Sequence, residues 1–178
     1  DQYEEWYGVQ HPHPSYLEDA VYGIPELHKE EISRAQLIAN PGCYPTSAIL
    51  AMAPAVKLGL IEPDIIIDSK SGVSGAGREL TMSTHYSEVN ENTMAYSLSG
   101  HRHLPEITQE LSLLTKQTLE ITFLTHLVPM TRGILSSCYS RLNPETTSTN
   151  NPSLSYIREV YQDFYKNHPF VVITDTPP

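Results

Sequence analysis

The apolar positions of the chain change their spacing just before residue 43. Leu37-Ile38-Ala39 is a short apolar run typical of a strand, and Pro41-Gly42 then breaks it. Beyond the break, the three- and four-residue spacing of apolar residues predicts a helix that starts near Cys43 and stops at Gly59. The residues that carry this spacing are Ala48, Ile49, Met52, Ala53 and Val56. Pro54 lies inside the run and should kink the helix.

Three further segments have the patterns of strands. Ile65-Ile66-Ile67 is a continuous β-branched run, which predicts a strand buried on both faces. Residues 119–128, where apolar and polar side chains alternate, and residues 133–142 are the next candidates. Between the run at 65–67 and residue 119, a helix should begin near Pro105 and bury one apolar face. This face is formed by Leu104, Ile107, Leu111 and Leu114.

The remaining segments are less regular. Residues 1–13 predict a loop or a fraying helix, residues 30–35 a short helical turn, residues 143–152 a loop and residues 170–174 a short strand. Ser153 should cap a helix whose apolar stripe is expected to belong to the core. The stripe consists of Leu154, Ile157, Val160, Tyr161 and Phe164. This order of strands and helices predicts an α+β or mixed α/β domain with helices against one sheet face.

Composition narrows the classes of protein. The 178 residues suffice for one ordinary core, and the net charge of -10 opposes binding to nucleic acid or anionic membranes. With only Cys43 and Cys138, and no long apolar run, we expect neither secretion nor a membrane span, and therefore a cytoplasmic protein or, in a plant, a plastid stromal one. An anionic substrate would need local arginines, for which Arg78, Arg102 and Arg132 are candidates.

Cys43 is the clearest candidate for chemistry. A thiol at a helix N-terminus lies beside unpaired backbone N–H groups and the positive end of the helix dipole, which both favour the nucleophilic thiolate. A lone cysteine is more often a buried apolar residue. Here the Pro41-Gly42 turn and the helix start favour a reactive thiol instead.

Gly100-His101-Arg102-His103 supplies two imidazoles and a guanidinium just before the helix at Pro105. Glu106 follows His103 by three residues, a spacing that allows the carboxylate to orient the imidazole on one helix face. An ordinary pair of surface histidines is the alternative. A metal site would need further ligands at suitable spacing, and we expect no metal.

A glycine-rich loop, residues 71–78, follows the strand predicted at Ile65. Its glycines would let backbone amides approach a phosphate or a cofactor ring, although a plain tight loop is an equal alternative because the dinucleotide fingerprint is missing. A thiol and an imidazole are the minimum for covalent thiol catalysis. Cysteine hydrolases and thiol-dependent aldehyde dehydrogenases share this minimum, but the hydrolases need no cofactor loop.

Together the motifs resemble those of one family. ANPGCYPT at 39–46, SGVSGAGR at 71–78, GHRHLPEI at 100–107 and HLVPMTRGIL at 126–135 are similar, in this order, to successive motifs of N-acetyl-gamma-glutamyl-phosphate reductases. VYGIPEL at 21–27 also matches, so the resemblance covers nearly the whole chain.

The resemblance implies an α+β fold like the C-terminal domain of glyceraldehyde-3-phosphate dehydrogenase, with a mostly antiparallel mixed sheet and helices packed on one face. Residues 1–41 would be the tail end of an NADP-binding Rossmann domain. Residues 42–178 would be a catalytic and dimerisation domain without its C-terminal end. The chain departs from the family at both ends, since the nucleotide fingerprint and the closing strand and helix are missing, and we expect such a fragment to be inactive alone.

The implied reaction is the NADPH-dependent reduction of N-acetylglutamyl 5-phosphate to N-acetylglutamate 5-semialdehyde, a step of arginine biosynthesis. Cys43 would attack the acyl phosphate and form a thioester, which hydride would then reduce. His103, held by Glu106, is the first choice for the acid/base, and His101 would share or exchange that role.

The resemblance also implies binding roles. Arg132 and Arg102 would bind carboxylate or phosphate, and Asn40 would lie near NADP. The loop formed by Ser74, Gly75, Ala76 and Gly77 would face the nicotinamide. The expected partners are a small acyl phosphate and further copies of the chain in a homodimer or tetramer. Two alternatives stay open: a related reductase acting on aminoadipyl or aspartyl phosphate, and a non-catalytic oligomerisation domain.

Overall fold

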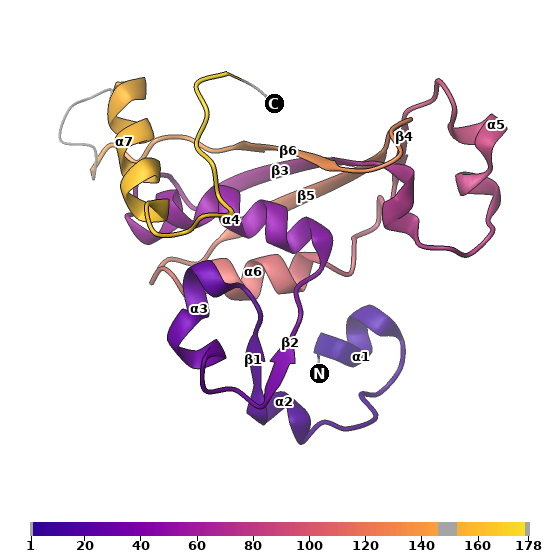
Figure 1. Ribbon diagram of the computed structural model, residues 1–178, viewed down its shortest axis with the longest axis horizontal. Coiled ribbons are helices and arrows are strands. Elements are labelled where there is room, and N and C mark those ends of the chain that lie inside the picture. Colours follow the sequence, from indigo (N-terminus) through magenta and orange to yellow (C-terminus); the bar gives the residue numbers. More distant parts are fainter. Residues whose placement is uncertain (1, 146–152, 177–178) are drawn as a thin grey trace.

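A four-stranded mixed sheet forms the centre of the structure, a computed structural model that describes residues 2–145 and 153–176 (Figure 1). Its strands run in the order β4 (Met94–Tyr96), β5 (Glu120–Leu127), β3 (Asp64–Ser71) and β6 (Ile134–Tyr139). The central pair β3–β5 is parallel, and the two outer pairs are antiparallel. The predicted α+β class and the mostly antiparallel mixed sheet are therefore confirmed.

Helices cover one face of this sheet. α4 (Cys43–Lys57) and α6 (Leu104–Ser112) lie side by side beneath the strands in Figure 1. The core forms where these two helices meet β3, because their apolar positions recur at helical spacing on one side. Its fully buried members include Ala48 and Ile49 from α4, Ile65 and Ile67 from β3, and Ile107 and Leu111 from α6.

The other face of the sheet is open, which corrects the prediction for the run at 65–67. Ile65 and Ile67 are buried against the helices, whereas Ile66 points the opposite way and is 41% exposed. Successive side chains of a strand face opposite sides, so a strand covered by helices on one side only must alternate. Three identical residues in a row could not indicate which side is covered.

Helix α4 continues through Pro54 to Lys57. Proline has no N–H, so the carbonyl of Leu50 loses its usual helical partner. The hydroxyl of Tyr165 donates to this carbonyl at 2.6 Å, and that of Tyr161 donates to the carbonyl of Ala51 at 2.8 Å. Both tyrosines belong to α7 (Leu154–Tyr165), which thereby supplies the hydrogen bond that the proline removes.

Helix α7 starts where it was predicted to start. The burial of its apolar stripe, however, differs from the predicted core position. Ser153 caps the helix and accepts the N–H of Tyr156 at 3.3 Å. Leu154 is exposed and only Tyr165 is fully buried, because α7 packs at the edge of α4 rather than over the sheet. Phe170 and Val172 are also exposed, and the structure forms no strand there, since no neighbouring strand is present to share hydrogen bonds.

Residues 20–39 form a small parallel unit. β1 (Ala20–Tyr22) pairs with β2 (Leu37–Ala39), and α3 (Pro25–Ile32) connects them. This helix begins earlier than the turn predicted at 30–35, with Pro25 in its first turn. Ahead of it lie two short helices: α1 (Gln2–Tyr7), inside residues 1–13 where a loop or fraying helix was predicted, and α2 (Tyr16–Asp19), for which no element was predicted.

The long connection between β3 and β4 contains three short helical pieces. They are two 3-10 turns, Val73–Ala76 and Met82–Thr84, and helix α5 (Tyr86–Val89). The loop predicted at 143–152 lies largely outside the described residues. Across the described ranges, 2–145 and 153–176, no helix has the length and apolar character needed to cross a membrane.

Candidate active site

Cys43 is the first residue of α4, and the turn before it is fixed by two sets of hydrogen bonds. The N–H of Gly42 donates to Glu106 Oε1 at 2.8 Å, and its carbonyl accepts the N–H and the hydroxyl of Thr46 at 3.0 and 2.9 Å. Gly42 is the N-cap of α4, and no side chain of the part of the chain that the structure describes caps this end of the helix. The exposed thiol of Cys43 therefore lies at a helix end that is open to an anion.

The imidazole of His103 packs directly against this turn. A β-carbon placed on Gly42 would lie 2.7 Å from Nε2 and 2.8 Å from Cε1 of His103. Only glycine leaves room for the ring here. The other ring nitrogen, Nδ1, is buried and has no hydrogen-bond partner among the residues that the structure describes. The imidazole predicted as the acid/base thus lies next to the turn that precedes the predicted nucleophile, Cys43.

His101 lies behind His103 in an aromatic setting. Its Nδ1 accepts the backbone N–H of His103 at 3.1 Å, and the two ring centroids are 4.6 Å apart. The edges of three aromatic rings surround it, those of Tyr44, Tyr96 and Phe123. Because Nδ1 is the acceptor, the proton of the neutral ring is assigned to Nε2.

Both imidazoles are held in the neutral form near pH 7. Burial, with smaller contributions from His103 and Arg102, lowers the pKa of His101 from 6.5 to about 4. Burial and Arg102 also lower the pKa of His103. A neutral imidazole can accept a proton, so His103 can take one from a thiol and return it later.

Glu106 has a different partner from the one predicted. Its Oε1 accepts the hydroxyl of Tyr22 at 2.6 Å as well as the N–H of Gly42, while His103 Nδ1 has no hydrogen-bond partner within residues 2–145 and 153–176. The carboxylate lies in the first turn of α6 and is directed at the start of α4. The contact expected between Glu106 and the ring of His103 is therefore replaced by a contact with the turn that precedes Cys43.

A cavity of about 270 Å³ joins these groups. Its wall includes Cys43 and the three residues of the predicted His-Arg-His segment, residues 101–103. The residues that line it are Cys43, Tyr44, Ser71, Gly75, Ala76, Ser83, Thr84, Met94, Tyr96, His101, Arg102, His103 and Leu127. Arg102 is exposed at this cavity, and its guanidinium lies 5.7 Å from the ring centroid of Tyr7. Arg132 and Asn40 are exposed and are not part of this wall.

Two tyrosines of this cavity were not predicted. The hydroxyls of Tyr44 and Tyr96 are 2.7 Å apart, and burial raises the pKa of each phenol, so both remain protonated. Tyr44 directly follows Cys43 in the sequence, and this adjacency could have indicated that Tyr44 belongs to the site. Tyr96 lies in a non-periodic segment, and no local pattern points to it.

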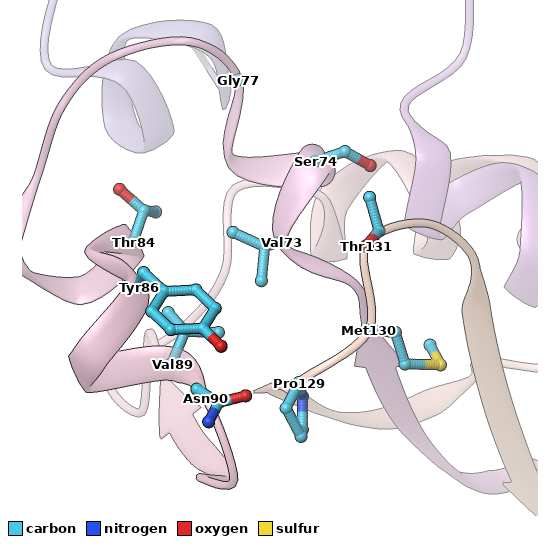
Figure 2. Close-up of a pocket in the computed structure, with 10 residues that line it drawn as sticks. All are labelled: Val73, Ser74, Gly77, Thr84, Tyr86, Val89, Asn90, Pro129, Met130 and Thr131. Carbon is cyan, nitrogen blue, oxygen red and sulfur yellow. The ribbon is translucent and has the colours of Figure 1, made fainter.

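The glycine-rich loop separates this cavity from a second one, of about 450 Å³. Gly75 and Ala76 line the Cys43 cavity, whereas Ser74 and Gly77 line the second, so the predicted loop residues divide between the two. Figure 2 shows the second cavity between residues 84–90 and the loop 129–131. Its wall contains no cysteine, histidine or carboxylate, so the reactive groups belong to the smaller cavity. Among the described residues, no three histidine, cysteine or carboxylate side chains are grouped to hold a metal ion.

Comparison with curated proteins gives closely similar relatives. The chain is 52% identical over 99% of its length to an N-acetyl-gamma-glutamyl-phosphate reductase of Dehalococcoides mccartyi, of which it covers 50%. It is 54% identical over 95% of its length to the protein of that name in Pelotomaculum thermopropionicum, of which it covers 47%. The chain therefore spans about half the length of these curated relatives.

Solved structures share the fold. Aspartate semialdehyde dehydrogenase II from Vibrio cholerae, complexed with ASA, superposes with a TM-score of 0.60 at 16% identity, over 93% of this chain and 55% of its own. The Candida albicans aspartate semialdehyde dehydrogenase with NADP superposes with a TM-score of 0.54 at 14% identity, over 80% and 44%. Residues 43–178 match the family model described as semialdehyde dehydrogenase, dimerisation domain. Because this match covers most of the chain, the chain belongs to the semialdehyde dehydrogenase family.

Proposed function

We propose that this chain supplies the catalytic part of an NADPH-dependent N-acetyl-gamma-glutamyl-phosphate reductase, which forms N-acetylglutamate 5-semialdehyde. The observation that carries the proposal is the exposed thiol of Cys43 at an uncapped helix end, with the neutral imidazole of His103 against the preceding residue. The choice of substrate is supported by the names of the curated relatives. These relatives are about twice as long as this chain.

Cys43 begins the proposed reaction. His103 accepts the thiol proton, and the sulfur attacks the acyl carbon of the substrate. The carbonyl oxygen becomes an oxyanion, which the open N–H groups of α4 and the protonated phenol pair are suited to stabilise. When this intermediate collapses, the bond from carbon to the phosphate oxygen breaks, phosphate leaves, and a thioester on Cys43 remains.

The second half of the reaction reduces the thioester. Gly75 and Ala76 present no large side chain to the cavity of Cys43, which fits a flat nicotinamide ring at this wall. NADPH, when bound, supplies the hydride. Hydride addition to the thioester would leave an oxyanion on the former carbonyl oxygen, which His103 would protonate to give the thiohemiacetal. Return of that proton to His103, with release of the Cys43 thiolate, then yields the aldehyde.

Charge and connectivity support the remaining assignments. Arg102 is the cation at the cavity, and it can pair with the carboxylate or phosphate of an anionic substrate. Arg132 as a second anion ligand, and Asn40 and the Ser74–Gly77 loop at NADP, stay predictions. The parallel unit β1–α3–β2 is typical of a nucleotide-binding domain, which supports assigning residues 1–41 to the tail of such a domain.

The open face of the sheet supports self-association as a homodimer or a larger homo-oligomer. Four large apolar side chains on it are between 41% and 59% exposed: Ile66, Leu124, Leu135 and Tyr139. They surround Asp68, which pairs with Lys70 and His126. An apolar face with a small charged centre is a suitable surface for a second copy. Leu135→Asp should convert the dimer to monomer in sedimentation, and a wild-type monomer would contradict this assignment.

The test of the proposed reaction uses the longer protein that joins this chain to a nucleotide-binding domain. Cys43→Ser should abolish semialdehyde- and phosphate-dependent reduction of NADP, the reverse reaction, because a hydroxyl is a far weaker nucleophile near neutral pH. Cys138→Ser is the matched control and should retain activity. If Cys43→Ser stays active, the covalent mechanism is wrong. Activity with aspartyl or aminoadipyl semialdehyde, but not the N-acetylglutamyl one, would instead correct the substrate.

A further inference from the structure

The VYGIPEL motif contributes no residue to the wall of the Cys43 cavity, yet it lies against the nucleophile's turn. The hydroxyl of Tyr22 donates to Glu106 Oε1 at 2.6 Å. The same carboxylate oxygen accepts the N–H of Gly42 at 2.8 Å. One atom of Glu106 therefore connects Tyr22, at the end of β1, to the residue that precedes Cys43.

The backbone after Tyr22 touches the same turn. The N–H of Gly23 donates to the carbonyl of Ala39 at 2.9 Å. A β-carbon on Gly23 would lie 2.9 Å from Ile38 Cγ2 and 3.2 Å from Pro41 Cδ, so this close approach requires glycine. The turn from residue 38 to residue 42 is thus fixed along its length by two neighbouring residues of the motif.

Tyr22 keeps its proton, as a donor must. Burial, the hydrogen bond to Glu106 and the charges of Glu106 and Glu110 all raise the pKa of this phenol. The hydroxyl remains a donor to a carboxylate across the range in which enzymes work, and hydrogen bonds to charged groups are stronger than neutral ones.

Gly42 is in contact with both reactive groups. Its carbonyl carbon is bonded to the nitrogen of Cys43, and its α-carbon packs against the ring of His103. A displacement of Gly42 would therefore change the distance and angle between thiol and imidazole. We propose that Tyr22 is a positioning residue for the Cys43–His103 pair, which acts through Glu106 on the N–H of Gly42. This inference rests on the proposed covalent function.

The direct test is Tyr22→Phe, which removes the hydroxyl and keeps the ring. In the longer protein, kcat should fall roughly tenfold, the effect of one lost hydrogen bond to a charged group, while KM for the acyl phosphate changes less. In this chain, alkylation of Cys43 by iodoacetamide at pH 7.5 should slow as well, with Cys138 as the internal reference.

Tyr161→Phe is the matched control. It removes a hydroxyl that donates at 2.8 Å to the carbonyl of Ala51, which lies in α4 more than two helical turns beyond Cys43. It should lower the unfolding temperature but leave kcat and the alkylation rate of Cys43 unchanged. Equal effects of the two variants on kcat would show that Tyr22 has only a structural role and would overturn the inference.

A double-mutant cycle tests whether Tyr22 acts through Glu106. Glu106→Gln keeps the shape of the side chain, so it also serves if Tyr22→Phe folds poorly. The double variant should be no slower than Glu106→Gln alone, because both changes interrupt one connection. Additive losses in kcat, or a Tyr22→Phe enzyme within twofold of wild type, would overturn the inference. Because Cys43→Ser tests the reaction separately, an active Cys43→Ser enzyme would identify failure of the proposed function instead.

Discussion

The N-cap residues of α4 and α7 have nearly the same backbone angles, but only the N-cap of α7 has a side chain that caps its helix. Gly42 precedes α4 with φ −65° and ψ 160°, and Ser153 precedes α7 with φ −64° and ψ 153°. Ser153 uses its hydroxyl to accept the N–H of Tyr156 and closes its helix. Gly42 has no side chain, and its helix start stays open beside Cys43. The serine of α7 satisfies an N–H group at its own helix end, whereas glycine at the start of α4 offers no such acceptor.

The contrast extends to what surrounds each end. At α4, the space that a side chain would occupy is filled by the ring of His103. At α7, Ser153 is exposed, and its hydroxyl lies 2.7 Å from that of Ser155. The residue at each N-cap therefore follows from its neighbours in space, since both backbones would accept a serine.

The largest effect is expected when Gly42, the N-cap of α4, is replaced by the residue that caps α7. Gly42→Ser suits the backbone and adds a cap, but its β-carbon would lie 2.7 Å from His103 Nε2 and must displace the ring. We expect kcat to fall by about 100-fold, as for other small misplacements of reacting groups. Gly42→Ala has the same clash without the cap and should match it. Activity close to wild type in either variant would show that the position of the ring is unimportant.

A second prediction concerns how the stability of the protein against unfolding changes at acidic pH because of His101. The pKa of His101 is lowered by burial from 6.5 to about 4, so the unfolded chain binds this proton more readily than the folded chain. The contribution of His101 to stability is complete above pH 6.5 and is lost as the pH falls from 6.5 toward 4. His101→Gln should weaken this dependence, measured as the difference in urea midpoint between pH 7 and pH 5. An unchanged difference would contradict the assignment of a neutral, buried ring.

Local sequence predicted the parts of this comparison that depend on neighbours in the chain. The Pro41-Gly42 break before an apolar helical run indicated the position of Cys43, and Ser153 before an amphipathic stretch indicated the cap of α7. Both signals extend over a few residues. The order of strands and helices likewise predicted the α+β class.

The contacts that shape the site join distant residues, and local patterns do not contain them. Glu106 was expected to hold His103, three positions away, but it binds Tyr22, which lies 84 positions away in the sequence. The pairing of Tyr44 with Tyr96 is similar, with 52 positions between them. Side-chain direction at a helix start depends on which segment packs against it, and helical spacing alone cannot supply this information.

A smaller effect is expected where α4 loses a hydrogen bond to proline. Tyr165→Phe leaves the part-buried carbonyl of Leu50 without this donor, which should lower the free energy of unfolding by about 1–3 kcal/mol. Tyr156→Phe, on the exposed side of the same helix, should change it by less than about 0.5 kcal/mol. Urea denaturation of both variants measures the difference. If the two losses are equal, the tyrosine hydroxyl does not compensate for Pro54.

The smallest effect is expected at the closed N-cap. Ser153→Ala removes the acceptor for the N–H of Tyr156 and should cost about 1 kcal/mol, while Ser153→Gly should cost only a few tenths, as found for N-caps in general. Neither variant should change the alkylation rate of Cys43, because α7 contributes no residue to the wall of its cavity. With Ser153→Gly, α7 would have the same N-cap as α4. If the helix then tolerates glycine at little cost, what distinguishes the two ends is the imidazole packed against Gly42 rather than the cap itself.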